Sequence, residues 1–514
     1  MSLRYVVRLE GDANLTTVLT RREAERLKRQ LAAELKLDKY PSDDELASLK
    51  GVAVAKKPVK TSSGVSVITV VAPIFSCPHG KCIYCPGGAP FGTPQSYTGE
   101  EAVVKTASLH GYDPRKQVEA SVEKLRKMGH SVDKVELIII GGTFTATSKD
   151  FQRNFIKECL DALTGVYTNS LEEALKVCEK SPIHVSGITV ETKPDWAKKE
   201  IATRLVEYGV TRVEIGVQVL DDEILRIVNR GHTLEDVVEA TADLKDTSFK
   251  VCYHIMPNLP GSSPQKDLEM FTKMFEDERF RPDQLKIYPT LVLPGTGLET
   301  MWRKGVYKPY PDEELMKMFV EFMRRVPPYV RISRIQREIP LHISLDGLHI
   351  PNLRQVVEKA VGNSCRCIRC REHSHVGKKV DPNKAVIKIL RYRSSRGLDY
   401  FVSAEDEDAD ALLGFVRVRI PPRALRPELE DAGLVRELHV YGAMKKVGEP
   451  TDETTSQHRG IGRRLMKEAE NMIFLEHGLG KVIVISGVGV KAYYRKLGYT
   501  DFGPYMAKIR GKIN

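Results

Sequence analysis

The chain has 514 residues, 41% of them hydrophobic and 29% charged, with 79 Lys and Arg against 68 Asp and Glu. A single hydrophobic core stops growing well below this length, so we expect roughly two to four domains, and the composition excludes wholesale disorder. No run of about 18 apolar residues occurs, and the opening MSLRYVVRLEGD is charged. We therefore expect a cytoplasmic protein with neither a membrane span nor a signal peptide.

The net charge of +11 is concentrated in two segments. Residues 321–400 contain 17 Lys and Arg against 7 Asp and Glu, and residues 1–60 contain 13 against 9. Such an excess occurs on ordinary solvated faces and on surfaces that bind nucleic acid. We therefore expect a polyanionic partner at these two segments.

The predicted elements begin with an amphipathic helix over residues 20–36, where apolar residues recur at helical spacing between basic ones. From about residue 65 to 340, short apolar runs alternate with helix-like segments such as QVEASVEKLRKMG and DEILRIVNRG. This alternation predicts a parallel α/β sheet, open or closed into a barrel. The predicted strands are Val67–Val71, Glu136–Ile140, Ile188–Glu191, Arg212–Val217, Lys250–Met256, Gln284–Tyr288 and Arg331–Gln336.

The region from about residue 381 onward has a different pattern. Three apolar runs predict a meander, in which the acidic segment EDEDADA is a hairpin turn. A further strand, a glycine-rich helix start, another strand and a short helix at about 490–497 follow. The predicted strands are Ala385–Tyr392, Tyr400–Ala404, Leu413–Ile420, Val435–Val440 and Lys481–Ser486.

The first chemical motif is the loop CPHGKCIYCPGG, directly after the first predicted barrel strand. Its thiols, Cys77, Cys82 and Cys85, would hold three irons of a cubane cluster and leave the fourth iron open for S-adenosylmethionine (SAM). Tyr84, just before the last cysteine, resembles the radical SAM enzymes, although C-x4-C-x2-C departs from their commonest spacing, C-x3-C-x2-C. The alternative is a zinc loop with His79 as the fourth ligand.

Polar residues and glycines follow several of the predicted strands. In barrels of this kind, function gathers at the C-terminal ends of the strands. Gly141 and Gly142 would let the backbone approach SAM, although an ordinary tight turn also explains them. Glu191 and Gln218, at the ends of two later strands, are further candidate SAM contacts.

A second motif, QHRGIG at residues 457–462, begins a helix. The pattern Q/R-x-x-G-x-G/A exposes successive backbone N–H groups at a helix N-terminus, which is a pyrophosphate site. The later segment ISGVGVKAYYRKLGY resembles the YxxLGY segment of GNAT acetyltransferases, where a tyrosine lies near the thioester sulfur. We therefore expect an acetyl-CoA site, with one of Tyr493 and Tyr494 packed in the core.

Together the two motifs resemble the catalytic subunit of Elongator, in its archaeal or bacterial stand-alone form. The resemblance covers about residues 55–514 and includes the strings QSYTGE, IIGGTF, ITVETKPDW, VNRGHT, PTLVLPGTGL, VRELHVYG and GPYM. That family modifies the wobble uridine of tRNA, installing a carboxymethyl-type group at carbon 5. The resemblance implies that a 5′-deoxyadenosyl radical abstracts hydrogen from the methyl of acetyl-CoA. The carbon radical then adds to uridine, and thioester hydrolysis releases CoA.

The resemblance also implies roles for individual residues. Besides the three thiols of the loop, Tyr494 and Glu437 would be catalytic, and Glu437 would orient water or act as a base. Lys134 looks like a family lysine that contacts acetyl-CoA and bridges the two domains. The implied acetyl-CoA contacts are Lys134, Glu437, Leu438, His439, Val440, Gln457, His458, Arg459, Gly460, Gly462, Tyr493 and Tyr494.

A second cysteine cluster lies inside the basic segment 321–400, with ligand spacing typical of a structural zinc site. The candidate ligands are Cys365, Cys367, Cys370 and His373, with His375, His349 or a distant residue as alternatives for the fourth position. Free thiols are the competing interpretation. Zinc would fold a loop between the two catalytic regions and present three arginines to phosphates: Arg366, Arg369 and Arg371.

The expected fold class is α/β, a radical SAM partial (β/α) barrel fused to a C-terminal GNAT domain. The expected regions are a basic tRNA-binding helical region at 1–60, the radical SAM domain at 61–340, a zinc-binding connector at 341–380 and the GNAT domain at 381–514. The expected cofactors are a 4Fe–4S cluster, SAM, acetyl-CoA as co-substrate, and zinc.

The expected partner is the anticodon stem-loop of tRNA, and accessory subunits or a homodimer are left open. Two other functions compete with wobble-uridine modification: a protein lysine acetyltransferase with a structural cluster, and a non-catalytic tRNA-binding scaffold. All three loop cysteines and the glycine signature are present, which disfavours the scaffold. The basic segment 321–400 would repel basic histone tails, which disfavours a dedicated histone substrate.

Overall fold

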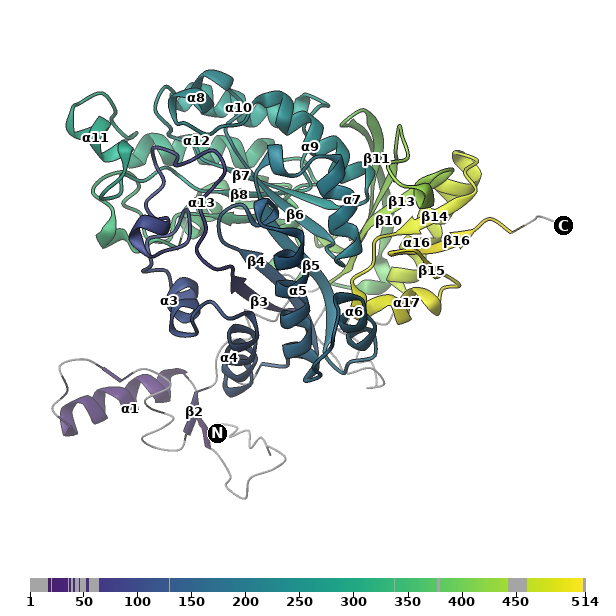
Figure 1. Ribbon diagram of the computed structural model, residues 1–514, viewed down its shortest axis with the longest axis horizontal. Coiled ribbons are helices and arrows are strands. Elements are labelled where there is room, and N and C mark those ends of the chain that lie inside the picture. Colours follow the sequence, from purple (N-terminus) through teal and green to yellow (C-terminus); the bar gives the residue numbers. More distant parts are fainter. Residues whose placement is uncertain are drawn as a thin grey trace.

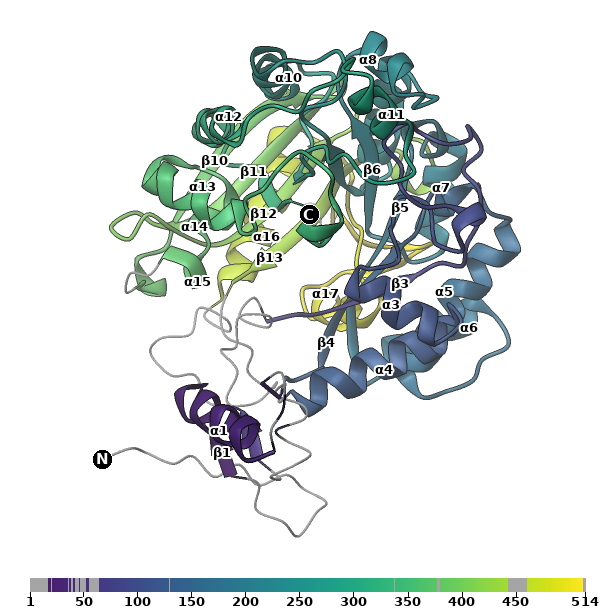
Figure 2. The same cartoon turned by 90° about the vertical axis from the view of Figure 1, so that its left-hand side faces the viewer.

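The computed structural model of the chain describes residues 17–19, 21–35, 37, 40–41, 46, 52–54, 64–128, 130–336, 338–376, 380–441 and 460–511. Its main body contains two seven-stranded sheets. Figures 1 and 2 show these sheets packed side by side, the first in blue and teal and the second in green and yellow. Two domains therefore share one body.

The first sheet is parallel throughout and joins its strands in chain order. Each strand predicted between residues 65 and 340 is present, with bounds that differ by a few residues. In the described part of the chain the edge strands do not pair with each other, so the barrel is open on one side. The strands are β3 (Ser66–Val71), β4 (Lys134–Ile140), β5 (His184–Thr192), β6 (Arg212–Gln218), β7 (Lys250–Ile255), β8 (Gln284–Ile287) and β9 (Arg331–Ile335).

Helices cover the outer face of this barrel (Figure 1). Their ends follow from local sequence: the side chains of Asp113 and Ser148 cap α4 and α5, and Gly165, at φ 74°, ends α5 in the left-handed conformation. The helices are α3 (Ala102–Leu109), α4 (Pro114–Lys127), α5 (Lys149–Thr164), α6 (Leu171–Glu179), α7 (Lys199–Glu207), α8 (Asp222–Ile227), α9 (Leu234–Asp246), α10 (Pro264–Glu276), α11 (Gly297–Arg303) and α12 (Asp312–Arg325).

Helix α8 is shorter than the predicted segment DEILRIVNRG. It ends at Ile227, and Asn229 and Gly231 then adopt left-handed conformations with φ of 53° and 70°. The resulting turn carries Arg230 into the barrel, where its guanidinium donates to the carbonyl of Gly216 at 2.7 Å. The segment therefore aims a buried cation instead of extending the helix.

The interior of this barrel is polar, whereas closed barrels are usually filled with aliphatic side chains. Side chains at alternate positions of β4, β6 and β7 line an internal cavity, among them Glu136, Arg212, Glu214 and Lys250. Burying charge is costly unless it is paired or bound. The barrel interior is therefore a binding space and not a packed core.

The second sheet is mixed, with the strand order β10-β11-β12-β13-β14-β16-β15. The acidic segment is a hairpin turn between β11 and β12, as predicted. The strands are β10 (Val386–Ser394), β11 (Gly397–Asp406), β12 (Ala411–Ile420), β13 (Ala432–Val440), β14 (Lys481–Val484), β15 (Thr500–Phe502) and β16 (Tyr505–Ile509). Helices α16 (Ile461–Asn471) and α17 (Lys491–Arg495) complete this C-terminal domain.

Strands β13 and β14 separate part of the way along. They pair in parallel only over Ala432–Val435 and Lys481–Val484. Beyond Val435, β13 continues to Val440 while still pairing with β12 on its other side. Residues 436–440 therefore extend beyond the pairing with β14, and α16 packs against this strand.

The N-terminal ends of the barrel strands face this second domain. The segment after β14 packs so tightly on β5 that a Cβ on Gly487 would lie 2.2 Å from the carbonyl oxygen of Ser186, and one on Gly489 2.3 Å from the nitrogen of Val185. The glycines of the ISGVGV segment are therefore needed where the domains meet.

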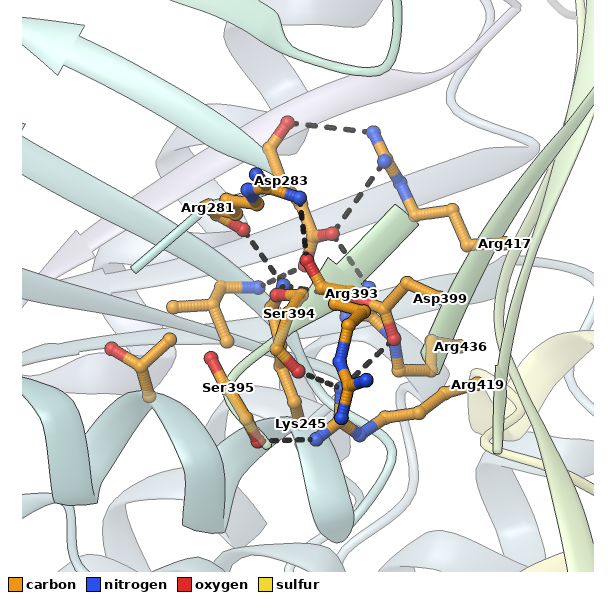
Figure 3. Close-up of polar contacts among 12 residues, drawn as sticks. Lys245, Arg281, Asp283, Arg393, Ser394, Ser395, Asp399, Arg417, Arg419 and Arg436 are labelled. Atoms are coloured by element: carbon orange, nitrogen blue, oxygen red, sulfur yellow. Dashed lines mark hydrogen bonds and ion pairs between the residues drawn. The ribbon is translucent and has the colours of Figure 1, made fainter. Parts of the chain in front are cut away.

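A buried ionic network crosses the same interface (Figure 3). Asp283, just before β8, accepts from both terminal nitrogens of Arg436 on β13, each at 2.7 Å. Asp399 on β11 accepts from Lys245 of α9 at 3.0 Å and from Arg419 at 2.9 Å. Because each carboxylate and cation is paired, these charges fix the domains in one relative position.

The remaining described elements lie outside the two sheets. Residues between β9 and β10 form α13 (Leu353–Val361), α14 (Ile368–Arg371) and α15 (His373–Val376). Near the N-terminus, α1 (Arg21–Glu34) confirms the predicted helix and lies apart from the barrel with the parallel pair β1 (Thr17–Leu19) and β2 (Val52–Val54) (Figures 1 and 2). No helix in these described ranges is long and apolar enough to cross a bilayer.

Candidate active site

One cavity of about 1420 Å³ runs from the cysteine loop through the barrel to the C-terminal domain. Most of the predicted site residues line it together: Cys77, Gly142, Glu191, Gln218, Lys134, Glu437, Leu438, His439, Val440, Gly460, Gly462, Tyr493 and Tyr494. Cys82, Cys85 and Gly141 lie in the same loops without being part of the lining. Gln457, His458 and Arg459 lie outside the described residues.

The three loop cysteines have separate hydrogen-bond environments. The sulfur of Cys77 lies 3.5 Å from Oγ1 of Thr143, that of Cys82 lies 3.2 Å from Nε2 of His79, and Cys85 accepts from the backbone nitrogen of Ser96 at 3.2 Å. One zinc ion with Zn–S bonds of about 2.3 Å would bring its sulfurs to about 3.8 Å from one another. Among the described residues, this trio is not one of the groups whose ligand atoms all lie within 4.8 Å. The spread fits a multi-iron cluster better than a single ion.

Two buried cations beside this loop were missed in the sequence analysis. Arg230 points a terminal nitrogen at the sulfur of Cys82, 3.7 Å away, and Lys193 lies 3.4 Å from the carbonyl of Gly231. Burial, together with the charges of Lys193 and Arg230, lowers the pKa of His79 to about 4. Burial raises the pKa of the Cys77 thiol, while its hydrogen bond to Thr143 and the charge of Arg230 oppose the rise. Both cations lie within the quoted strings VNRGHT and ETKPDW, but nothing local distinguishes them from solvated residues.

A band of paired charges occupies the middle of the cavity. Glu214 accepts from His254 at 2.7 Å and forms ion pairs with Lys286 and, at 3.3 Å, Arg212. Burial raises the pKa of Glu214, but Lys286 and the bond from His254 outweigh it and hold that pKa well below its usual value. Glu214, Cys252 and His254 are close enough together to hold an ion. The cations already bound to Glu214 make it a poor metal ligand, so the band is suited to contacting a polar substrate.

At the other end of the cavity, Glu437 on β13 accepts from Nε of Arg417 at 2.8 Å. Burial raises its pKa, but the charges of Lys250 and Arg417 prevail and lower it, so the carboxylate stays ionised. Burial lowers the pKa of the neighbouring His439 to about 4, which keeps this imidazole neutral. An ionised carboxylate and a neutral imidazole thus lie on the part of β13 that extends beyond its pairing with β14.

Lys134 and the tyrosine pair complete this end. Lys134 is the first residue of β4, within the strand and not just before it, and burial lowers its pKa. Tyr494 is buried and Tyr493 is 39% exposed, which confirms that one of the two packs in the core. Gly462 faces Tyr493: a Cβ there would lie 2.5 Å from the hydroxyl of that tyrosine. Gly460, at φ 78°, begins α16 in the left-handed conformation.

The second cysteine cluster is built differently. The sulfurs of Cys365, Cys367 and Cys370 all lie within 4.8 Å of one another, as three ligands of one ion would. His373, the expected fourth ligand, is not in this group. The alternative His375 lies 3.0 Å from Glu372, and His349 lies 3.6 Å from Asp312.

The sequence analysis expected all three arginines of this loop to contact phosphates, but the structure gives them different roles. Arg371 is buried and donates to Glu405 at 2.8 Å and to a backbone carbonyl, so it is structural. Arg366 pairs with Asp410 at 2.6 Å. Only Arg369 lines the cavity. Arg369 and Arg371 lie two residues apart on the one-turn helix α14 and so point in different directions, whereas Arg366 lies before this helix.

Comparisons with known proteins agree with this architecture. The Radical SAM superfamily model matches residues 71–274, and the Radical_SAM C-terminal domain model matches residues 282–362. The open parallel sheet with its cysteine loop is thus a radical SAM partial barrel, followed by a mixed-sheet domain.

Relatives extend the likeness over nearly the whole chain. The tRNA uridine(34) acetyltransferase of Methanocaldococcus jannaschii is 45% identical over 480 residues, covering 91% of this chain and 88% of the relative. Human Elongator complex protein 3 is 42% identical over 468 residues, covering 88% and 85%. The solved structure of Methanocaldococcus infernus Elp3, with residues 1–46 deleted, has a TM-score of 0.77 at 40% identity and covers 87% of this chain and 100% of that one. The chain therefore belongs to the family of the tRNA uridine(34) acetyltransferases and Elongator complex protein 3.

Proposed function

We propose that the protein modifies the wobble uridine of tRNA, adding a carboxymethyl-type group at carbon 5 with SAM and acetyl-CoA as co-substrates. The observation that carries this function is the single cavity that joins the cysteine loop to the end of β13. A protein lysine acetyltransferase would need only the second of these sites. A tRNA-binding scaffold would need neither.

At the first end, Cys77, Cys82 and Cys85 would hold three irons of a 4Fe–4S cluster, which when bound with SAM supplies a 5′-deoxyadenosyl radical. Arg230 and Lys193 place two positive charges beside the loop, which would offset part of the negative charge of a thiolate-bound cluster. The proposed SAM contacts are Gly141, Gly142, Glu191 and Gln218. Gly141 and Gly142 have φ of 115° and 64°, a turn that brings backbone close to a ligand and that other residues rarely adopt.

At the second end, a GNAT-type site would bind acetyl-CoA, with the pyrophosphate at the start of α16 and the acyl arm along β13. Residues 436–439 extend beyond the pairing of β13 with β14, so their backbone N–H and C=O groups on that side would be available to the amides of the arm. Glu437 would take a proton from the water that attacks the thioester carbonyl, because it is ionised and held in place by Arg417. Lys134 and Tyr494 would contact the acyl group.

The role of Glu437 has its own test. Glu437→Gln keeps the shape of the side chain and removes the base, so CoA release should fall by about 100-fold. Acetyl-CoA affinity, measured by calorimetry, should change little. Unchanged CoA release would remove Glu437 from the chemistry.

The remaining assignments are proposals of the same kind. The tRNA anticodon stem-loop would reach the cavity through the open side of the barrel, and zinc would be held by the second cysteine cluster. The proposed regions are 1–60, 61–340, 341–380 and 381–514, in the roles that the sequence analysis gave them.

The decisive experiment traces atoms from acetyl-CoA. The protein is reconstituted anaerobically with iron and sulfide, then incubated with reductant, SAM, tRNA and acetyl-CoA carrying three deuterium atoms on its methyl group. Mass spectrometry should find one deuterium in 5′-deoxyadenosine and two in a modified uridine. Omission of SAM should abolish both labelled products.

Other outcomes would contradict the proposal. Labelled acetyl groups on lysine side chains, with unmodified tRNA, would favour the protein acetyltransferase. Tight tRNA binding with no labelled product under any condition would favour the scaffold.

A further inference from the structure

Arg369 is a cation of the second cysteine cluster. It lies on α14 between the second and third cysteines of the cluster and lines the cavity. No hydrogen bond or ion pair joins it to any residue in the described ranges, whereas Arg366 and Arg371 of the same loop are both paired. The loop therefore carries one cation that no described carboxylate neutralises.

The charges around Arg369 also leave it without a neutralising carboxylate among the described residues. The positive charges of Arg354 and Arg331 act on Arg369, and the carboxylates of Glu358 and Glu372 partly offset them. Glu358 is bound to Arg354 at 2.6 Å, and Glu372 to Arg331 at 2.5 Å. Three guanidiniums thus face two carboxylates, each already occupied. The excess charge of this corner is that of Arg369.

The place of Arg369 relative to the barrel fits a substrate entrance. Helix α14 packs on β9, since the nitrogen of Ile368 donates to the carbonyl of Val330 at 2.9 Å. Strand β9 is one edge of the open barrel, and side chains of both edge strands line the cavity, among them Val67 of β3 and Arg334 of β9. Arg369 therefore lies at the side where the barrel is not closed.

A base that reacts inside this cavity must be turned out of its stack, and its phosphates must then stay at the mouth. A guanidinium binds a phosphate with two parallel hydrogen bonds. Resting on the proposed function, we propose that Arg369 binds a phosphodiester next to the uridine that enters the barrel. The three cysteines would serve to hold this cation at the entrance.

The test combines a protein variant with a chemically altered RNA. The probes are an anticodon stem-loop with uridine at the wobble position, and the same RNA with a neutral methylphosphonate on either side of that uridine. Arg369→Gln should weaken binding of the unaltered RNA by about tenfold and lower the slope of log Kd against log salt by roughly 0.7 to 0.9. With wild-type protein, one methylphosphonate should cause a similar loss. With Arg369→Gln, the same methylphosphonate should cause little further loss.

Control variants separate this role from others. Arg366→Gln, in the same loop but paired with Asp410, should leave RNA affinity and its salt slope unchanged. Arg369→Lys should restore part of the affinity. Acetyl-CoA affinity of Arg369→Gln should equal that of wild type, whereas a tenfold loss there would assign Arg369 to the phosphates of CoA and overturn the proposal.

Two results would contradict the inference and leave the proposed function standing. One is equal RNA affinity for Arg369→Gln and Arg366→Gln, while the wild-type enzyme modifies tRNA. The other is additive losses from Arg369→Gln and every methylphosphonate. If instead the wild-type enzyme binds the stem-loop but never modifies it, the proposed function fails and Arg369 can still be scored by binding.

Discussion

The two ends of the barrel are used differently from those of most (β/α) barrels. At the C-terminal ends of the strands, the cysteine loop, the Gly141–Gly142 turn and Arg230 gather around one end of the cavity, as barrel architecture predicts. The N-terminal ends, usually a place of stability, open instead onto β13, with Lys134 and Lys250 as the first residues of their strands. Strand β6 spans seven residues, so at roughly 3.3 Å per residue the two ends lie about 20 Å apart.

In the proposed function the barrel is used from both ends, and its polar interior makes this possible. An aliphatic core would have separated the two sites, whereas the paired charges around Glu214 leave a continuous cavity between them. In the proposed function, cluster binding at the C-terminal end depends on individual cysteines. Acetyl-CoA binding at the N-terminal end depends on how the second domain packs against the barrel. Variants should therefore fail in different ways at the two ends.

The largest effect is expected at the cysteine end. Cys82→Ala removes one of three proposed iron ligands, so modified uridine should fall by at least about 100-fold, with iron content reduced in parallel. Thermal stability and acetyl-CoA affinity should be nearly unchanged, because the second end is intact. Cys178→Ala, at a buried cysteine of α6, is the matched control and should keep its iron. Full iron content in Cys82→Ala would refute the assignment of this ligand.

At the other end, the ionic network should dominate stability. Asp283→Asn removes the buried carboxylate that Arg436 and Arg417 share in the interface, which should destabilise the fold by about 3–5 kcal/mol. The urea midpoint measures this loss. Asp277→Asn removes a more exposed partner, that of Arg279, and should cost at most about 1 kcal/mol. Equal shifts for the two variants would mean that the network does not hold the domains together.

A smaller effect is expected from the tight contact between the domains. Gly487→Ala would place a methyl group 2.2 Å from the carbonyl oxygen of Ser186, so β5 and the segment after β14 must move apart, at a cost of about 1–3 kcal/mol. Because this movement widens the N-terminal end, acetyl-CoA affinity should fall while iron content stays constant. Gly511→Ala has nothing within 4 Å and should be neutral. A neutral Gly487→Ala would show that the contact is easily relaxed.

The smallest effect concerns pH. Burial lowers the pKa of His439 to about 4 in the folded chain, whereas an unfolded histidine titrates near 6.5. Acid therefore favours the unfolded state: the contribution of the neutral imidazole is complete above about pH 6.5 and is lost as the pH falls towards 4. Between pH 7.5 and 5.5, wild type should lose about 1 kcal/mol more stability than His439→Asn, measured by urea unfolding at both values. Parallel losses would mean that His439 titrates normally.

Much of the fold could be predicted because its signals are local. Apolar runs of strand length between helical segments identified all seven barrel strands, and Gly460 marked the start of α16. The cysteine loop was equally readable, since its three cysteines lie within nine residues of one another. The early end of α8 was missed because it depends on the left-handed conformations of Asn229 and Gly231, which serve to place Arg230.

By itself, the sequence determined the seven barrel strands, the two cysteine loops and the family, because hydrophobic period and motif spacing are properties of neighbouring residues. Only the tertiary structure decided which distant residues meet: Lys134 and Glu437 in one cavity, and Glu214 between Arg212 and Lys286. It also decided that Arg369 faces the cavity while Arg366 and Arg371 are bound elsewhere. Each of the three arginines contributes the same charge to the total. The packing of the loop and of the two domains sets the direction of each side chain and therefore its contacts.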